Sequence, residues 1–327
     1  MAKNKRHYSE RRHIDTREAD AYEYHKPVFL EKCIEFLDIK EDGYYADGTL
    51  GGGGHSAEIL KRLGESGRLF AFDKDMTAIN YCREKFTEEL VKGEKSRIVI
   101  LNESFGGACN IKKEKKFDGI LLDLGVSSRQ LDDSSRGFSY RFDSPLNLRF
   151  ASDGPTAEDL LNTAEEVELA KILRSYGEEP FAGKIARRIV EMRRAFPFHS
   201  TVDLKNAVAD SVPASLLFKS LSRTFQAVRI AVNDELNVLQ STLSNIVPEV
   251  AKGGRIVVIS YHSLEDRIVK DVFRSLSKKK YSDDPVPQLI SEPLLTILTP
   301  KPIEPDEDYI KHNPRSRSAK LRVAEVK

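Results

Sequence analysis

Hydrophobic and polar positions follow two periods from Pro27 onward. Short apolar runs between turn residues are typical of buried strands, whereas apolar residues three or four apart predict helices with one buried face. Strands are predicted over residues 44–46, 68–72, 98–101, 119–122 and 255–260, and helices over 28–37, 57–63 and 78–85. This alternation favours an α/β fold: a doubly wound, mostly parallel, Rossmann-like sheet with helices on both faces.

The middle of the chain has a different pattern. Residues 156–220 show helical periodicity and no strand pattern, and from Phe225 to Ile246 apolar residues recur three or four apart, which predicts one long helix. We therefore divide the chain into a discontinuous α/β domain over 25–135 and 223–327 and a helical, substrate-side insertion over 136–222. Residues 1–24 are polar and predict a disordered tail.

Composition narrows the class of protein. No apolar run is long enough for a membrane-spanning helix, and the first residues contain no secretory signal pattern. The cysteines, Cys33, Cys82 and Cys109, are odd in number and widely spaced, which favours a reducing cytoplasm and no metal site. The net charge of +1 argues against a broad, nonspecific binder of nucleic acid.

A glycine-rich loop, DGTLGGGGHS at 47–56, lies between the first predicted strand and the next helix. Glycines at such a junction allow a tight turn and let a ligand approach the main chain without interference from Cβ atoms. A merely flexible turn is the alternative, which the strand–loop–helix context disfavours. The loop therefore predicts a nucleotide-type cofactor site.

Three aspartates indicate which cofactor the loop favours. Asp47, Asp73 and Asp123 end the first, second and fourth predicted strands. Ligands of open α/β sheets bind beyond these strand ends, so we expect the three carboxylates to converge on one crevice. They would repel a pyrophosphate and favour a cationic ligand with ribose hydroxyls, namely S-adenosylmethionine over NAD. Any single aspartate could instead be a helix N-cap.

A polar segment follows the fourth strand at the place where a methyl acceptor would lie. Ser127, Ser128 and Gln130 could hydrogen-bond the cofactor or an acceptor base there. The serines could equally close a turn through hydroxyl–backbone bonds.

A series of motifs relates the chain to a known family. They are HKPV at 25–28, DGTLGGGGHS at 47–56, LLDLGVSSRQLDD at 121–133, RGFSY at 136–140, YGEE at 176–179, RTFQAVRIAVNDEL at 223–236, ISYHSLEDRIVK at 259–270 and NPRSRSAKLRV at 313–323. In this order they resemble the MraW (RsmH) family of S-adenosylmethionine-dependent methyltransferases. That family methylates the N4 amine of a cytosine in small-subunit (16S) ribosomal RNA, in the decoding-centre region. The motifs run from Tyr24 almost to the C-terminus, which is more specific than a lone glycine loop.

The resemblance implies a methyltransferase fold with a helical insert, and cofactor contacts at the matching positions. These are Gly53, Gly54, His55, Asp73, Phe105, Asp123 and Gln130. Phe105 could stack on adenine or pack in the core. The chain departs from the family pattern SPLDMRM at 144–150, where it reads SPLNLRF, and Asn147 puts a catalytic role of that position in doubt.

Methyl transfer from a sulfonium is an in-line displacement that depends mainly on positioning. A cytosine amine is a poor nucleophile, so the protein should accept its hydrogen bonds and orient it. Family placement makes Asp123 and Ser127 candidate catalytic residues, and His262, which follows a predicted strand, a further candidate. Ser263 with Asp266 has the form of a helix capping box.

Basic residues gather in segments 311–327 and 184–194, and these are the predicted RNA contacts. Arg223, Gln226, Arg229 and Asn233 share one face of the long predicted helix and suit phosphate or base contacts, although such a face can simply be solvated.

We thus expect a ribosomal RNA (cytosine-N4)-methyltransferase that acts on free RNA or on the assembled small subunit, with homodimerisation left open. The alternatives are a DNA amino-methyltransferase, an NAD-dependent dehydrogenase and a catalytically idle RNA-binding scaffold.

Overall fold

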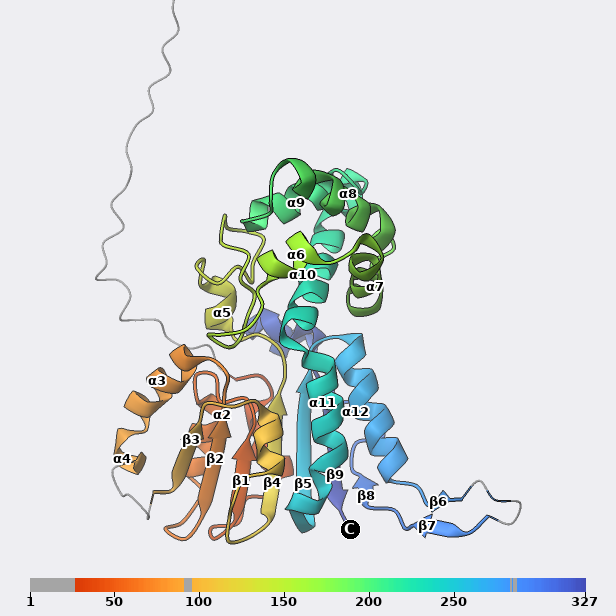
Figure 1. Cartoon of the computed structure of the whole chain (residues 1–327). Coiled ribbons are helices and arrows are strands. Elements are labelled where there is room, and N and C mark those ends of the chain that lie inside the picture. Colours follow the sequence, from red (N-terminus) through yellow and green to blue (C-terminus); the bar gives the residue numbers. More distant parts are fainter. Residues whose placement is uncertain (1–26, 91–95, 283, 285–286) are drawn as a thin grey trace, which may run out of the picture.

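The computed structural model of the chain describes residues 27–90, 96–282, 284 and 287–327 (Figure 1). The predicted tail 1–24 and His25 lie outside them. Within this part of the chain, a seven-stranded sheet has the strand order β3-β2-β1-β4-β5-β9-β8. The strands are β1 Tyr44–Asp47, β2 Arg68–Phe72, β3 Ile98–Leu101, β4 Phe117–Asp123, β5 Val250–Ser260, β8 Leu295–Ile297 and β9 Lys320–Val326. Strands β1 to β5 are parallel, whereas β9 is antiparallel to both of its neighbours.

Helices cover both faces of the sheet because successive strand residues point to opposite faces. Val257 and Ile259 of β5 pack with one set of helices, and Ile256 and Val258 pack with the other. The first set is α1 Leu30–Leu37, α2 Gly54–Leu60 and α3 Met76–Lys85, and the second is α11 Glu235–Asn245 and α12 Ser263–Leu276. The predicted doubly wound α/β fold is confirmed.

A group of helices stands above the carboxyl ends of the strands (Figure 1). It comprises α6 Ala157–Thr163, α7 Glu166–Gly177, α8 Ala182–Ala195, α9 Thr201–Ala209 and α10 Leu217–Asn233. Their apolar faces form a hydrophobic cluster of their own, which extends from Phe138 to Val228. The boundary predicted at 222/223 therefore falls inside α10, which contributes buried residues on both sides of it to this cluster.

The remaining elements are short. They are α4 Thr87–Leu90, α5 Ser128–Asp132, α13 Glu307–His312, β6 Lys280–Tyr281, β7 Leu289–Ser291 and the 3-10 turns η3 Phe105–Cys109, η4 Ala214–Leu216, η5 Val247–Glu249 and η6 Pro314–Ser318. Among them, β6 and β7 pair in a separate two-stranded sheet. No helix in the described ranges is long and apolar enough to span a bilayer.

The prediction of one long helix over 225–246 is wrong. The helix breaks at Asp234, whose φ of 53° is left-handed, and α10 and α11 meet there. The Asp234 carboxylate accepts a hydrogen bond from Nδ2 of Asn237 at 2.6 Å, which supports this conformation. The apolar periodicity continues across the break because α10 packs in the insertion and α11 packs on the sheet.

The prediction that segment 311–327 is a free basic surface is wrong for its second half. Residues 320–326 form β9 inside the sheet. Arg322 is 7% exposed, and its guanidinium binds the Asp266 carboxylate at 2.6 Å. Arg315 pairs with Asp132 at 2.8 Å on the surface. These cations balance acidic neighbours of the same chain.

Candidate active site

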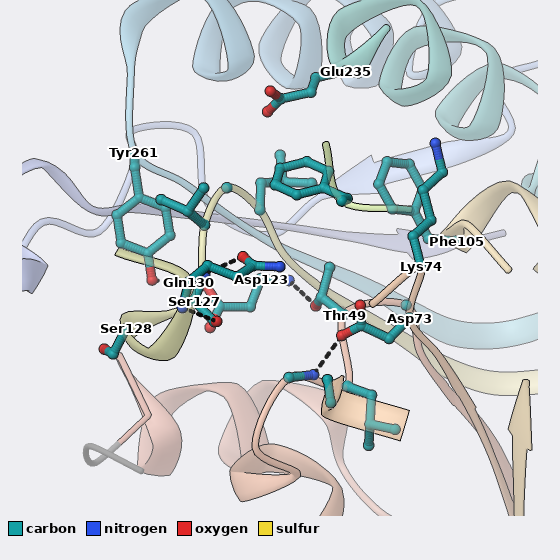
Figure 2. Close-up of a pocket in the computed structure, with 18 of the residues that line it drawn as sticks. Thr49, Asp73, Lys74, Phe105, Asp123, Ser127, Ser128, Gln130, Glu235 and Tyr261 are labelled. Atoms are coloured by element: carbon teal, nitrogen blue, oxygen red, sulfur yellow. Dashed lines mark hydrogen bonds between the residues drawn. The ribbon is translucent and has the colours of Figure 1, made fainter. Parts of the chain in front are cut away.

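A cavity of about 720 Å³ lies between the carboxyl ends of the strands and the insertion. Loops after β1, β2, β4 and β5 form one side of it, and residues of α10 and α11 form the other. Figure 2 shows this division, with Thr49 and Asp73 on one side and Glu235 across the cavity. We call these sides the strand-end half and the helical half. Ligands of doubly wound sheets bind at this position, beyond the neighbouring strands β1 and β4, where the strand order reverses.

The glycine loop needs glycine for steric reasons. Gly53 precedes α2 with φ +67°, and a Cβ there would lie 2.8 Å from the Phe86 ring and 2.9 Å from Sγ of Cys82. A Cβ on Gly54 would lie 2.2 Å from Cγ of Pro27. Gly54 lines the cavity, whereas Gly53 shapes the loop from behind. The loop therefore has a defined conformation that only glycine allows at these positions, and it exposes main-chain atoms to the cavity.

Asp73 organises the floor of the strand-end half. Its carboxylate accepts hydrogen bonds from the backbone N–H groups of Gly51 and Asp75, each at 2.8 Å. Burial outweighs these bonds and raises the pKa of Asp73 to about 6. A ligand with hydroxyl donors or a positive charge would stabilise the ionised form.

Asp47 corrects the expectation that three carboxylates converge on the crevice. It is 1% exposed and does not line the cavity. Its Oδ2 accepts a hydrogen bond from the Ser56 hydroxyl at 2.6 Å, and its Oδ1 accepts one from the backbone N–H of Thr49 at 3.1 Å. Asp47 therefore ties the glycine loop to β1 from below.

Asp123 lines the cavity at the end of β4, and its side chain is 23% exposed. The Tyr261 hydroxyl donates to Oδ1 at 2.7 Å, and Nδ1 of His55 lies 3.8 Å from Oδ2. The backbone N–H of Asp123 donates to Oγ1 of Thr49 at 2.7 Å, which fixes the end of β4 against the glycine loop. Burial raises the pKa of Asp123 to about 6, although His55 and Tyr261 oppose the shift.

Ser127 and Gln130 form a capping box at the start of α5. The Ser127 hydroxyl accepts from the backbone N–H of Gln130 at 3.2 Å, and Oε1 of Gln130 accepts from the backbone N–H of Ser127 at 2.9 Å. Nε2 of Gln130 donates to Asp75 at 2.9 Å. The Ser127 hydroxyl therefore closes a turn through a bond to the backbone, as the alternative interpretation of the sequence expected. Because this hydroxyl accepts in the bond and lines the cavity, its O–H can still donate to a ligand.

The predicted capping box of Ser263 and Asp266 is wrong by one residue. His262 is the N-cap of α12, and the backbone N–H of Glu265 donates to its Nδ1 at 3.4 Å. Ser263 instead donates to Glu178 at 2.9 Å. His262 lines the cavity at 12% exposure, and its Nε2 lies 3.2 Å from Oε1 of Glu265. The contact lacks hydrogen-bond geometry, and Nε2 has no hydrogen-bond partner among the described residues.

Phe105 begins η3 and lines the cavity. It also packs against the hydrophobic cluster between the sheet and helices α11 and α12. Figure 2 shows it beside Lys74, across from Asp73. An aromatic ring in this position can stack on a planar ligand. Both predicted roles of Phe105 are compatible with this placement.

Several cavity residues escaped sequence reasoning. Tyr261 directly precedes His262, and its contact with Asp123 joins β4 to β5. Lys85 donates to the carbonyl of Gly52 at 2.8 Å, and burial lowers its pKa. Glu235 and Glu265 also line the cavity, and neither lies at a predicted strand end. Only the position of Tyr261 next to a predicted strand end was a usable signal.

Arg229 corrects the prediction of a phosphate-binding helix face. Its Nε and Nη2 donate to Oε1 and Oε2 of Glu235 at 2.9 and 3.0 Å, and the two side chains are 13% and 10% exposed. Gln226 and Asn233 line the same cavity, and both are held by backbone groups. Gln226, Arg229 and Asn233 of the predicted face therefore form a cavity wall, whereas Arg223 does not line the cavity.

The donor set of the strand-end half fits S-adenosylmethionine. Burial raises the pKa values of Asp73 and Asp123, and a positively charged ligand would favour their ionised forms and so bind favourably. The glycine loop lets such a ligand reach the main chain. No group of three metal-ligating side chains occurs in the described residues. The sheet and this half of the cavity define a Rossmann-like methyltransferase.

Comparison with known proteins identifies the family. The model of the MraW methylase family matches residues 22–327, and the chain belongs to this family. Proteins named "Ribosomal RNA small subunit methyltransferase H" from Clostridium botulinum strain Kyoto and Clostridioides difficile strain 630 are 44% and 43% identical to it. These alignments cover 91% and 92% of this chain, and 97% and 98% of the relatives. A solved structure titled as a putative rRNA-methylase from Clostridium thermocellum has a TM-score of 0.43 and 11% identity, over 91% of this chain and 94% of that one.

The predicted family, enzyme class and cofactor are confirmed: the chain is an S-adenosylmethionine-dependent methyltransferase. The dehydrogenase alternative is thereby excluded.

Proposed function

We propose that the enzyme transfers a methyl group from S-adenosylmethionine to the N4 amine of a cytosine in small-subunit ribosomal RNA, in the decoding-centre region. The names of its relatives support the RNA substrate. One structural observation carries the proposal: a single cavity joins the carboxylates at the strand ends to a second, largely helical wall that leaves room for an acceptor.

The bound cofactor supplies an electrophilic methyl group on a sulfonium. We assign its binding to Asp73 and Phe105, to the loop residues Gly53, Gly54 and His55, to Gln130 beyond β4, and to Asp47 as the support of the loop. Asp123 has one carboxylate oxygen tied to Tyr261 and the other 3.8 Å from Nδ1 of His55. A carboxylate held in this way can accept a hydrogen bond from the acceptor amine and later take its proton.

Ser127 and His262 complete the proposed acceptor contacts. The Ser127 hydroxyl is fixed by its cap and can still donate a hydrogen bond. His262 lines the cavity, and its Nε2 is buried 3.2 Å from Oε1 of Glu265, so Glu265 holds the ring where it can contact an acceptor base. A target base in folded RNA must be unpaired or turned out of its helix to reach these groups.

We propose ribosomal RNA, either free or in the assembled small subunit, as the partner and the cytoplasm as the place of action. Arg194 of α8 is a candidate phosphate contact. Homodimerisation stays a prediction.

The test is a map of N4-methylcytosine in ribosomal RNA from cells with and without the gene, followed by methylation of isolated RNA and of small subunits in vitro. We expect one cytosine to lose its mark without the gene and to regain it with the purified enzyme. An unchanged map would contradict the substrate. A mark that forms equally on DNA would favour the DNA alternative.

A further inference from the structure

The helical half of the cavity contains a side-chain pair that a continuous helix could not form. Residues six apart in an α-helix are separated by about 240° around the axis and about 9 Å along it, so their side chains diverge. The left-handed Asp234 breaks the helix between Arg229 and Glu235, and the two side chains then meet through two hydrogen bonds. The left-handed conformation of Asp234, which is uncommon for residues other than glycine, therefore brings Arg229 and Glu235 together in the cavity wall.

The carboxylate of Glu235 is turned to the cavity across from Asp73 and Thr49 (Figure 2). Each of its oxygens accepts one hydrogen bond from Arg229. A carboxylate oxygen has a second lone pair, so Glu235 can accept further hydrogen bonds from a ligand while Arg229 holds it. Phe150, in the segment before α6, lines the same cavity and stacks on Phe138 with ring centroids 5.6 Å apart, so its ring offers a flat apolar surface for a base.

We infer that Glu235 accepts a hydrogen bond from the exocyclic amine of the target base and makes the cavity select cytosine over uracil, with Arg229 as its positioning residue. This inference rests on the proposed function. An ionised carboxylate only accepts hydrogen bonds. Cytosine presents an amine at carbon 4, whereas uracil presents a carbonyl oxygen that the carboxylate repels.

An acceptor in the plane of the base suits the chemistry of the amine. Its two N–H bonds lie in that plane, so a carboxylate that accepts one of them leaves the nitrogen lone pair perpendicular to the plane and open to the methyl group. During transfer the bond from sulfur to methyl breaks with its electron pair going to sulfur, and the new bond forms from nitrogen to methyl. One nitrogen-bound proton then passes to a carboxylate.

The first experiment compares Glu235→Gln with Glu166→Gln as a matched control. Glu166 is also the first residue of its helix and faces an arginine, Arg187 at 3.8 Å, but it is 44% exposed and outside the cavity. We expect Glu235→Gln to lower kcat/KM for RNA roughly 10- to 100-fold, since one good contact to a base edge is worth about that factor. Glu166→Gln should match the wild type, and both variants should bind S-adenosylmethionine as the wild type does in calorimetry.

The second experiment measures selectivity without turnover. With S-adenosylhomocysteine saturating, cytidine and uridine monophosphates are titrated into the wild type and Glu235→Gln. We expect the preference for cytidine to fall in the variant, mainly through weaker cytidine binding. An unchanged preference together with unchanged kcat/KM would overturn the inference. So would an equal loss of cofactor affinity, because Glu235 would then hold the cofactor's amino group.

A third variant tests the positioning role of Arg229. Glu235 faces Arg229 of α10 and Glu265 and His262 at the start of α12. Removal of the guanidinium in Arg229→Gln should shift the acid limb of the kcat/KM profile to higher pH, and Arg229→Lys should restore part of the shift. An unmoved limb in a folded variant would overturn this role. If the wild-type enzyme modified no cytosine amine, the proposed function would be refuted instead. The nucleotide titration would still show whether Glu235 makes the cavity prefer cytidine.

Discussion

The two halves of the cavity differ in how they are built. In the strand-end half, polar side chains follow parallel strands and are held by groups near the strand ends. Backbone N–H groups hold Asp73, and the Tyr261 hydroxyl holds Asp123. In the helical half, the pair of Arg229 and Glu235 depends on a helix break and on two helices that pack against different cores. The arrangement of the strand-end half therefore depends on the sheet, whereas that of the helical half depends on how the insertion packs on the sheet.

The difference teaches where specificity can change independently of the cofactor. Strand ends converge in any open parallel sheet, so the cofactor site follows from the topology. Arg229, the positioning residue inferred above, lies on α10, which packs in the insertion and not on the sheet. Three changes, in decreasing order of expected effect, test this division.

Asp123 ends β4 in the strand-end half and is the candidate contact for both the cofactor and the acceptor amine, so Asp123→Asn should have the largest effect. We expect methyl transfer to fall about 10²- to 10⁴-fold, which is the usual contribution of a positioned proton acceptor. Circular dichroism and thermal unfolding should show a folded protein, because Asn keeps the shape and the hydrogen bond from Tyr261. Activity close to that of the wild type would remove Asp123 from the mechanism.

Gly53→Ala tests the steric design of the strand-end half. The left-handed φ and the contacts with Phe86 and Cys82 should lower the free energy of unfolding by about 2 kcal/mol and weaken cofactor binding. Gly183→Ala in α8 is the matched change in the insertion, where a Cβ would meet nothing within 4 Å. It should raise stability by about 0.5–1 kcal/mol, measured by denaturant unfolding. Equal effects of the two changes would contradict the comparison.

The pH dependence of cofactor binding gives the smallest effect. Asp73 and Asp123 have pKa values of about 6 in the free protein, above the ordinary value, and a cationic ligand requires them ionised. Affinity should therefore rise about tenfold per titrating group from pH 5 to pH 7 and then level off. The contribution of these carboxyls to the stability of the free protein has the opposite sign and declines as the pH rises through 6. Calorimetry in buffers of different ionisation enthalpy should detect proton release near pH 6, and its absence would refute the assignment.

Sequence reasoning succeeded wherever local pattern and global fold agree. Asp73 and Asp123 could be placed because buried strands are short apolar runs whose ends are visible in the sequence. It failed at Asp47, since the residue ends a strand but its carboxylate turns beneath the loop to Ser56. It failed again at Arg322, which reads as a surface cation and is buried against Asp266.

The amino-acid sequence alone determined the α/β alternation, the glycine loop, the helical middle segment and the family. These properties depend on side-chain periodicity and on residue types that a given backbone position requires. Only the tertiary structure revealed the break at Asp234, the N-cap at His262 and the pairing of Arg229 with Glu235. The apolar period continues through the break, and the contacts that decide it come from two cores brought together by the fold.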